Sequence, residues 1–229
     1  RGAGLRVRNA VRFKQMHDKV EASYWHLRQL EQLRGALTDM VVHDLKSPLA
    51  AVTGSLDLLK RTAVHLLDPL QIELLDEARR GAGRLYDMIR TMLDVSRLDS
   101  GQMPMNPGAC DMVSLAREAL ALVAMRQAAP VRITSPDAVP AWCDAGLVVR
   151  VISNLLGNAQ RFTPSTGQIT VEVQLVGSST RVAVSDTGYG IAHEDLLHVF
   201  DTYFHAAARK ELKLTSTGLG LTFCKMAVE

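Results

Sequence analysis

The sequence of 229 residues has little cysteine and no long apolar run. Its three cysteines, Cys110, Cys143 and Cys224, lack CxxC spacing and a neighbouring histidine cluster, which argues against a disulfide framework and a zinc site. No run approaches the roughly 18 to 20 apolar residues that span a bilayer, and the N-terminal stretch has no apolar signal core. We therefore expect this segment to be cytoplasmic and to make no membrane contact, which leaves a membrane-anchored full-length protein open.

Charge of one sign is also lacking. The formal net charge is +2, acids and bases are interspersed, and aromatic residues make up 5% of the chain. Because no basic stripe is interleaved with aromatic side chains, nucleic acid is not an expected partner. With 47% hydrophobic and 22% charged residues, the chain has the composition of an ordinary globular protein and the length of two modest domains.

The first hundred residues are dominated by apolar side chains spaced alternately three and four apart, the pattern of coiled-coil helices. One such seam covers residues 13–41, a second covers 42–59 with a displacement of one residue, and a third covers 74–95. A single helical hairpin cannot cover stripes this broad. We therefore predict an all-α hairpin that pairs with a second copy into a dimeric four-helix bundle, with a signalling coiled-coil helix over residues 1–37.

The pattern changes after residue 100. Residues 101–108 contain glycine and two prolines and predict a hinge. Beyond it, helical and strand periods mix: Asp144 is placed to cap a helix, and residues 169–176 alternate apolar and polar side chains like one arm of an antiparallel hairpin. We assign residues 109–229 to an α+β domain, and we expect it to be incomplete at its C-terminal end because the sequence stops inside a predicted helix.

A histidine followed by an acid lies on the second seam. If the seam residue Val42 points into the bundle, His43 lies on the outward flank and Ser47 shares its face. The carboxylate of Asp44 can hold one ring N–H of the imidazole, so that the other nitrogen can accept a phosphoryl group. Pro48 lacks an N–H for the carbonyl of Asp44, so the helix loses a bond in this turn. An HD dipeptide alone is more often a solvated surface pair, and other motifs must support it.

Three motifs in residues 109–229 suit a nucleotide pocket that lacks the Walker P-loop. The first, NLLGNAQRF, places Asn154, Asn158 and Arg161 on nearly the same helical face. Amide oxygens suit Mg²⁺, which keeps most of its waters and bridges phosphates, and a guanidinium neutralises phosphate charge. Two asparagines on a helix are otherwise commonly surface or capping residues.

The other two motifs are rich in glycine. In SDTGYGI, Asp186 at a strand end can accept a hydrogen bond from an exocyclic amine, while Gly188 and Gly190 permit close approach of the backbone. The last motif opens an apolar helix, where backbone N–H groups can receive phosphate oxygens. Its residues are Thr217, Gly218, Leu219 and Gly220.

These motifs, in this order, resemble those of the sensor histidine kinases. VVHDLKSPL is similar to their phosphoacceptor box, and the three later motifs are similar to the N, G1 and G2 boxes of the Bergerat-type ATP-binding fold, an α+β two-layer sandwich. The resemblance implies a dimerisation and histidine phosphotransfer domain over residues 38–100 and an ATP-binding catalytic domain over 109–229. It also implies an ATP-dependent protein histidine kinase of a two-component system, with a homodimer, a response-regulator receiver domain and an upstream sensory module as partners.

The same resemblance implies a role for each site residue. His43 would be the phosphoacceptor and Asp44 its acid/base partner. ATP would bind together with Mg²⁺, which Asn158 would ligate and Asn154 would support, while Arg161 would approach the phosphates. The remaining pocket residues would be Asp186, which would read the adenine amine, and Gly188, Gly190, Thr217, Gly218, Leu219 and Gly220, which would shape the walls.

The resemblance leaves three alternatives open. Ser47 stands where relatives usually carry threonine or asparagine; it keeps the hydroxyl and loses the methyl, so a phosphatase activity is undecided. Residues 191–217 look like a lid with an F box, yet Phe200, Tyr203 and Phe204 could equally be core aromatics. An ATP-driven dimeric clamp of the same superfamily is the alternative function, although Asn154 stands where such proteins carry a general-base glutamate.

Overall fold

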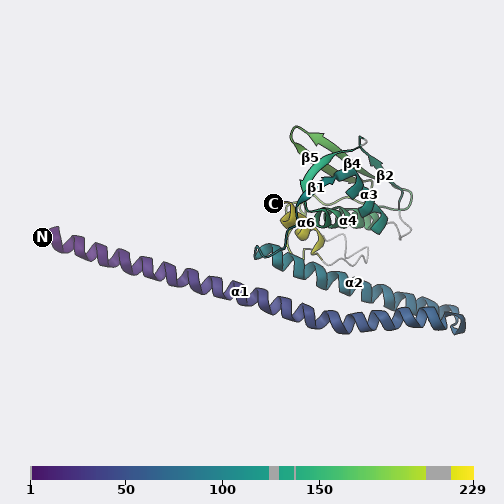
Figure 1. The fold of residues 1–229 in the computed structure, drawn as a ribbon, viewed down its shortest axis with the longest axis horizontal. Helices are drawn as coiled ribbons and strands as arrows, with labels where there is room; N and C mark the ends of the chain where they lie inside the picture. Colours follow the sequence, from purple (N-terminus) through teal and green to yellow (C-terminus); the bar gives the residue numbers. More distant parts are fainter. Residues whose placement is uncertain (1, 124–128, 137, 205–217) are drawn as a thin grey trace. The chain divides into compact units, whose positions relative to one another are not determined.

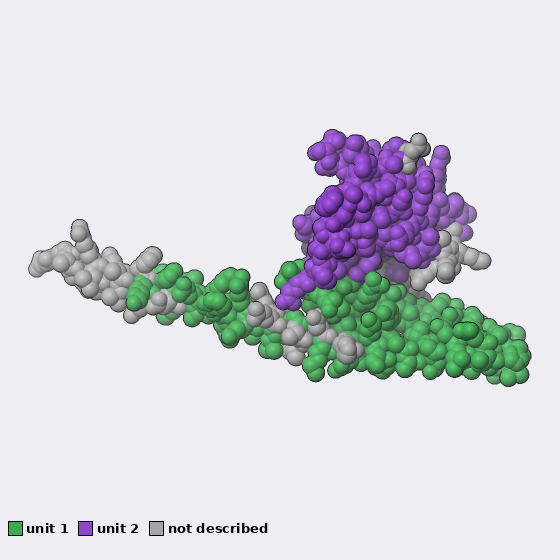
Figure 2. Space-filling model, in the orientation of Figure 1, with its two compact units in different colours: residues 1–101 green, residues 102–229 purple. Residues whose placement is uncertain are grey.

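The computed structural model describes residues 2–123, 129–136, 138–204 and 218–229. The chain forms two compact units, unit 1 over residues 1–101 and unit 2 over residues 102–229, coloured green and purple in Figure 2. Unit 1 is helical, and unit 2 combines helices with strands, as the sequence predicts. In the described part of the chain, no helix is both long and apolar enough to cross a membrane.

Unit 1 is a helical hairpin. Helix α1 spans Gly2–Ala63, a 3-10 turn η1 spans Val64–Leu66, and helix α2 spans Pro69–Asp99 (Figure 1). Asp68 begins α2 because its carboxylate accepts from the backbone N–H of Gln71, whose side chain in turn accepts from the N–H of Asp68. The predicted all-α hairpin is confirmed.

One half of the apolar seam belongs to the hairpin itself. Val42 and Leu49, seven residues apart on α1, are buried, and so are Leu75 and Ala82, seven apart on α2. Seven residues correspond to two helical turns, so each pair forms a row along one face of its helix. Because α1 and α2 pack against each other, we assign these rows to the contact between the two helices of one chain.

The other half of the seam is open in the single chain. Leu45, Val52 and Leu59 alternate with the buried row of α1, and they are 46%, 51% and 44% exposed. We call these three residues the open row. On α2 the exposed apolar residues include Leu74, Leu85, Met88 and Met92. Contiguous apolar surface of this kind marks a contact site for another protein chain.

Charged side chains join α1 to α2 near the hairpin turn. The ammonium of Lys60 lies 2.6 Å from Asp76, and Nε of Arg79 lies 2.6 Å from Asp57. Nη1 of Arg79 also lies 3.3 Å from Asp76, so four charges form one network. The hydrogen bond from Lys60 is the main cause that lowers the pKa of Asp76. Pairs this exposed add little stability one by one, but the network favours one register of the two helices.

Unit 2 has eight elements in its described residues. They are β1 Gly108–Asp111, α3 Met112–Val123, β2 Val131–Thr134, β3 Pro140–Cys143, α4 Ala145–Phe162, β4 Ile169–Val176, β5 Ser179–Asp186 and α6 Gly220–Val228. One sheet has the order β2-β4-β5, with β4 parallel to β2 and antiparallel to β5 (Figure 1). Strands β1 and β3 form a separate antiparallel pair. The predicted β4–β5 hairpin is confirmed.

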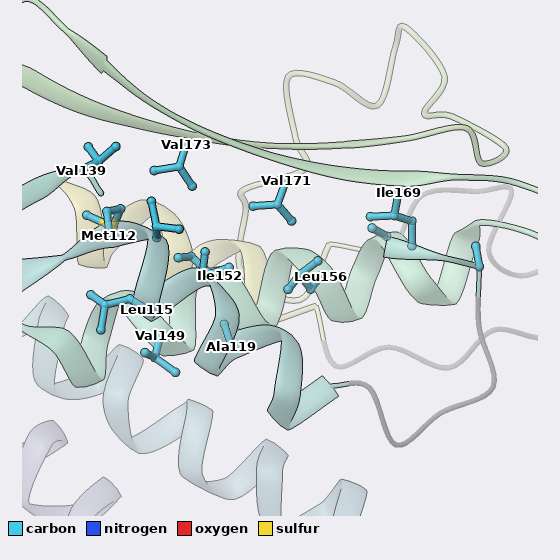
Figure 3. Packing of buried hydrophobic residues seen from close by; sticks show 14 residues of the cluster. Met112, Leu115, Ala119, Val139, Val149, Ile152, Leu156, Ile169, Val171 and Val173 are labelled. Atoms are coloured by element: carbon cyan, nitrogen blue, oxygen red, sulfur yellow. The ribbon is translucent and has the colours of Figure 1, made fainter. Parts of the chain in front are cut away.

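The core of unit 2 lies between the sheet and its helices. On β4, Ile169, Val171 and Val173 alternate with more exposed residues and are at most 1% exposed, so one face of the strand is buried. Ile152 and Leu156, one turn apart on α4, belong to the same cluster (Figure 3). Full burial of each such side chain contributes about 1.5–3 kcal/mol. The predicted two-layer α+β architecture is confirmed.

Strand β1 is an element that the sequence does not predict. Its four residues lack the alternating β-branched side chains that mark a strand. Tertiary contacts hold it instead: it pairs with β3, and Asp111, its last residue, accepts from the N–H of Val139 at 2.9 Å. The same carboxylate also accepts from the hydroxyl of Ser114, three residues on, at 2.6 Å. These bonds lower the pKa of Asp111 to about 2. The bond from Ser114 has the largest effect, and the bond from Val139 follows.

Candidate functional site

The phosphoacceptor box lies within α1. Its backbone stays helical through Pro48, although proline cannot bond the carbonyl of Asp44. Val42 is buried, whereas Asp44 and Ser47 are exposed. The side chain of His43 lies outside the described residues, so its outward position stays a prediction from the heptad pattern.

Two of the predicted pocket motifs meet at helix α4. The helix begins at the predicted N-cap, Asp144, whose Oδ1 accepts from the N–H of Leu147 at 3.0 Å. Asn154 and Asn158 are half-buried and lie one turn apart. A Cβ placed on Gly220 would lie 3.3 Å from Oδ1 of Asn154. The asparagine motif and the glycine-rich start of α6 are therefore in contact.

Helix α6 is fixed on α4 by interlocking side chains. The guanidinium of Arg150 lies over the ring of Phe223, 4.3 Å from its centroid, and Phe223 is fully buried. The thiol of Cys224 donates to the carbonyl of Val151 at 3.6 Å, and burial raises the pKa of this thiol to about 12. Cys224 therefore stays protonated, and the start of α6 has a fixed position beside the asparagines.

The DTGYG motif forms a turn between the end of β5 and the end of α4. Oδ1 of the exposed Asp186 accepts from the N–H of Gly188 at 2.8 Å, which orients the carboxylate. A Cβ on Gly188 would overlap the carbonyl oxygen of Phe162, so only glycine fits there. The N–H of Tyr189 donates to the same carbonyl at 3.3 Å, and Gly190 has a φ of +72°. This turn therefore lies against the end of the asparagine-bearing helix.

The F-box segment docks on the start of α6. The N–H of Tyr203 donates to the carbonyl of Gly218 at 3.1 Å, and the hydroxyl of Thr222 donates to the carbonyl of Phe200 at 3.0 Å. Tyr203 has a φ of 63°, a conformation that costs a tyrosine free energy and that clusters at ligand clamps. A Cβ on Gly218 would lie 2.7 Å from Cα of Tyr203, so the two backbones need this glycine to approach. Sequence reasoning missed Thr222, whose only signal is a hydroxyl within an apolar helix.

The structure describes most, not all, of the predicted pocket residues. Arg161 is half-buried in the last turn of α4, and Leu219 is buried at the start of α6. Thr217, and the part of the predicted lid that covers residues 205–217, lie outside the described residues. Phe200 and Tyr203 are 45% and 56% exposed, so the alternative interpretation as core aromatics is wrong for these two. Phe204 is half-buried, and for it that alternative stays a prediction.

Comparison with known protein families finds one matching domain in each unit. Residues 33–101 match the His Kinase A (phospho-acceptor) domain, and residues 143–229 match the histidine kinase-, DNA gyrase B- and HSP90-like ATPase family. The two matches together cover more than half of the chain, with the phosphoacceptor domain first. The chain contains the catalytic core of a sensor histidine kinase. In this kinase core, the match to the ATPase family includes all three pocket motifs.

Curated relatives of the kinase core bear the same family name. It is 29% identical over 227 residues to the hybrid signal transduction histidine kinase D of Dictyostelium discoideum, covering 94% of this chain and 14% of that protein. It is 28% identical over 233 residues to the sensor-like histidine kinase SenX3 of Mycolicibacterium smegmatis, covering 97% of this chain and 60% of that protein. The kinase core thus spans less than two thirds of the length of either relative.

Solved structures show the same fold. Full-length ShkA, in complex with AMPPNP, aligns with a TM-score of 0.65 and 22% identity over 83% of this chain and 40% of that chain. The Acinetobacter baumannii histidine kinase AdeS aligns with a TM-score of 0.51 and 20% identity over 81% of this chain and 85% of that chain. The kinase core therefore shares its fold with histidine kinases of low sequence identity.

Proposed function

We propose that this kinase core transfers the γ-phosphoryl group of ATP to His43 and then to an aspartate of a response-regulator receiver domain. One observation carries the proposal: in unit 2 the glycine-rich start of α6 contacts Asn154 of α4, and the DTGYG turn contacts Phe162 at the end of the same helix. This junction combines amide oxygens, a carboxylate and backbone N–H groups. A nucleoside triphosphate requires these same types of hydrogen-bonding group.

Each wall of the junction suits a different part of ATP. Asp186 would accept from the adenine amine, because its carboxylate has acceptor capacity beyond the bond from Gly188. The start of α6, with Gly218 and Gly220, would bind phosphate oxygens through backbone N–H groups, and Thr217 and Leu219 would complete that wall. Arg161, in the last turn of α4, would neutralise phosphate charge.

The same residues suit a Mg²⁺ ion that binds together with ATP. Asn158 would ligate the ion through its amide oxygen, and Asn154 would support it from the preceding turn, where its Oδ1 already lies against Gly220. Mg²⁺ keeps several waters and uses phosphate oxygens, so few protein ligands suffice. When bound, the ion would neutralise charge on the phosphates during transfer.

His43 would be the nucleophile. Asp44, exposed beside it on the same helix, would hold one ring N–H so that the other nitrogen can attack. The N–P bond forms as the bond from the γ-phosphorus to the bridging oxygen breaks, ADP leaves, and the imidazole proton passes to Asp44. Ser47, one turn further on, is the residue that would position water if the core also removes phosphate from the receiver.

A homodimer is part of the proposal. The open row on α1 would pack against the same row of a second copy, so that two hairpins form a four-helix bundle. The long α1 would connect this bundle to an upstream sensory module. The acceptor histidine and the surface that pairs the two copies would then lie on one helix.

Incubation of the full-length protein with Mg²⁺ and γ-labelled ATP tests the proposal. Wild-type protein should acquire label that survives base and is lost in acid, as phosphohistidine does. His43→Gln should acquire none, whereas His26→Gln, which changes an exposed histidine elsewhere on α1, should label like wild type. Absence of label from wild-type protein would refute the proposed function.

A further inference from the structure

One side chain of unit 2 holds the connection between the two units. At the end of unit 1, the N–H of Gly101 donates to the carbonyl of Leu98, so the backbone is fixed to α2 up to this residue. In unit 2, the N–H of Asn106 donates to Oδ2 of Asp144 at 2.8 Å. Residues 102–105 lie between these two anchors, and all four are described and form neither helix nor strand.

The two carboxylate oxygens of Asp144 have separate partners. Oδ1 accepts from the N–H of Leu147 and caps α4, while Oδ2 accepts from the N–H of Asn106. The bond from Leu147, and then that from Asn106, lower the pKa of Asp144. The group is therefore ionised at neutral pH, where both oxygens accept. A helix cap needs only one of them.

We infer that Asp144 is a positioning residue that shortens the free connection between the ATP-binding unit and the unit that carries His43. The inference rests on the proposed function, because transfer requires the two units to meet. With the bond from Asn106 in place, five Cα–Cα steps follow Gly101, a reach of at most about 17 Å. Without it, the next anchor is Gly108 at the start of β1, seven steps away, a reach of at most about 24 Å.

The difference in reach determines how much the phosphorylation rate of His43 should change when the bond is lost. The effective concentration of a tethered group falls roughly as the −3/2 power of tether length, so five steps lengthened to seven lower it about 1.7-fold. Loss of the bond to Asn106 should therefore slow phosphorylation of His43 about 1.7-fold. Binding of ATP involves unit 2 alone, so the KM for ATP should not change.

Asp144→Asn separates the two roles of the side chain. Asparagine caps helices about as well as aspartate, so α4 should keep its start. It has only one acceptor oxygen, and its NH₂ would face the N–H of Asn106 as a second donor. Asp68→Asn is the matched control, because Asp68 caps α2 through Gln71 in the same way but at the hairpin turn.

The test compares the full-length wild-type protein with both variants in the presence of ATP and Mg²⁺. In Asp144→Asn we expect the amide of Asn106 to exchange its hydrogen about tenfold faster. The single-turnover phosphorylation rate should fall about 1.7-fold at saturating ATP, with the KM for ATP unchanged. Asp68→Asn should leave all three quantities as in wild type.

Two results would overturn the inference alone. Unchanged exchange at Asn106 in Asp144→Asn would show that the carboxylate does not hold the connection. Faster exchange with an unchanged phosphorylation rate would show that the held connection does not position the unit. A wild-type protein that takes up no label would instead refute the proposed function, and this inference with it.

Discussion

The two units differ in where their apolar surface is buried. In unit 2, the inward residues of β4, such as Val171, are at most 1% exposed within one chain, whereas in unit 1 the open row is about half exposed. Unit 2 therefore buries its core within one chain, whereas the seam of unit 1 would be covered only in the proposed dimer. The proposed chemistry divides in the same way, with the nucleotide pocket in unit 2 and the acceptor histidine in the unit that has the open row.

Charging the open row should break the dimer and leave unit 2 folded. Val52→Asp combined with Leu59→Asp would place unpaired carboxylates in the interface between two copies, which costs several kcal/mol. We expect the dimer dissociation constant to rise at least about 1,000-fold, measured by analytical ultracentrifugation. Leu122→Asp, at an exposed apolar position of unit 2, is the control and should leave the dimer intact. A dimer that survives the double substitution would contradict the conclusion that the open row of unit 1 pairs the two copies.

Removing the proposed Mg²⁺ ligand should affect unit 2 and leave unit 1 unchanged. We expect Asn158→Ala to lower incorporation of label from γ-labelled ATP at least about 100-fold, because charge on the transferred phosphoryl group loses its metal ion. The dissociation constant of the dimer should stay at its wild-type value, measured on the same samples. A variant that labels normally would remove Asn158 from the site.

A core substitution in unit 2 should act independently of dimerisation. Leu156→Ala empties space in a fully buried position of α4 and should lower the free energy of unfolding of unit 2 by about 2–5 kcal/mol, measured by urea titration. The loss should be the same at low and high protein concentration. Leu122→Ala, which changes an exposed position, should cost less than about 0.5 kcal/mol. Concentration dependence of the Leu156→Ala effect would show that unit 2 is not self-sufficient.

The smallest expected effect is on the stability of unit 2 at acidic pH. The pKa of Asp111 is lowered from 3.8 to about 2 in the folded state, so its bonds stabilise unit 2 above about pH 4. That contribution is lost as the pH falls through about 2, because the protonated group accepts less well from the hydroxyl of Ser114 and from the N–H of Val139. Urea unfolding followed through Trp142 should show a shallower loss of stability between pH 4 and pH 2 in Asp111→Asn than in wild type. If stability falls equally steeply with pH in both proteins, Asp111 does not contribute to the acid sensitivity of unit 2.

Local patterns predicted most of the fold. The seams on α1 and α2, the alternation on β4 and the N-cap Asp144 are visible in the sequence because each depends on neighbours within a few residues. Strand β1 is not visible, since it is held by contacts from β3 and Val139 rather than by its own composition. The bond from Asn106 to Asp144 joins residues 38 apart, a separation that no local pattern reveals.

The candidate site shows the same division. Asn154, Asp186 and Gly188 could be named in advance because their side chains, or the lack of one, suit the chemistry directly. The contribution of Thr222 and the strained backbone of Tyr203 arise only when the F-box segment packs on α6, so sequence reasoning could not find them. The role of Thr217 stays a prediction.

The most direct test of the account maps the phosphate after full-length protein has reacted with ATP and Mg²⁺. Trypsin cleaves after Arg34 and Lys46, so the peptide over residues 35–46 contains His43 but not Ser47. Mass spectrometry at neutral pH should find the phosphate on His43 in this peptide, and none there in Asn158→Ala. Hydrolysis of ATP without any phosphorylated peptide, as an ATP-driven clamp would give, or phosphate confined to another residue, would contradict the account.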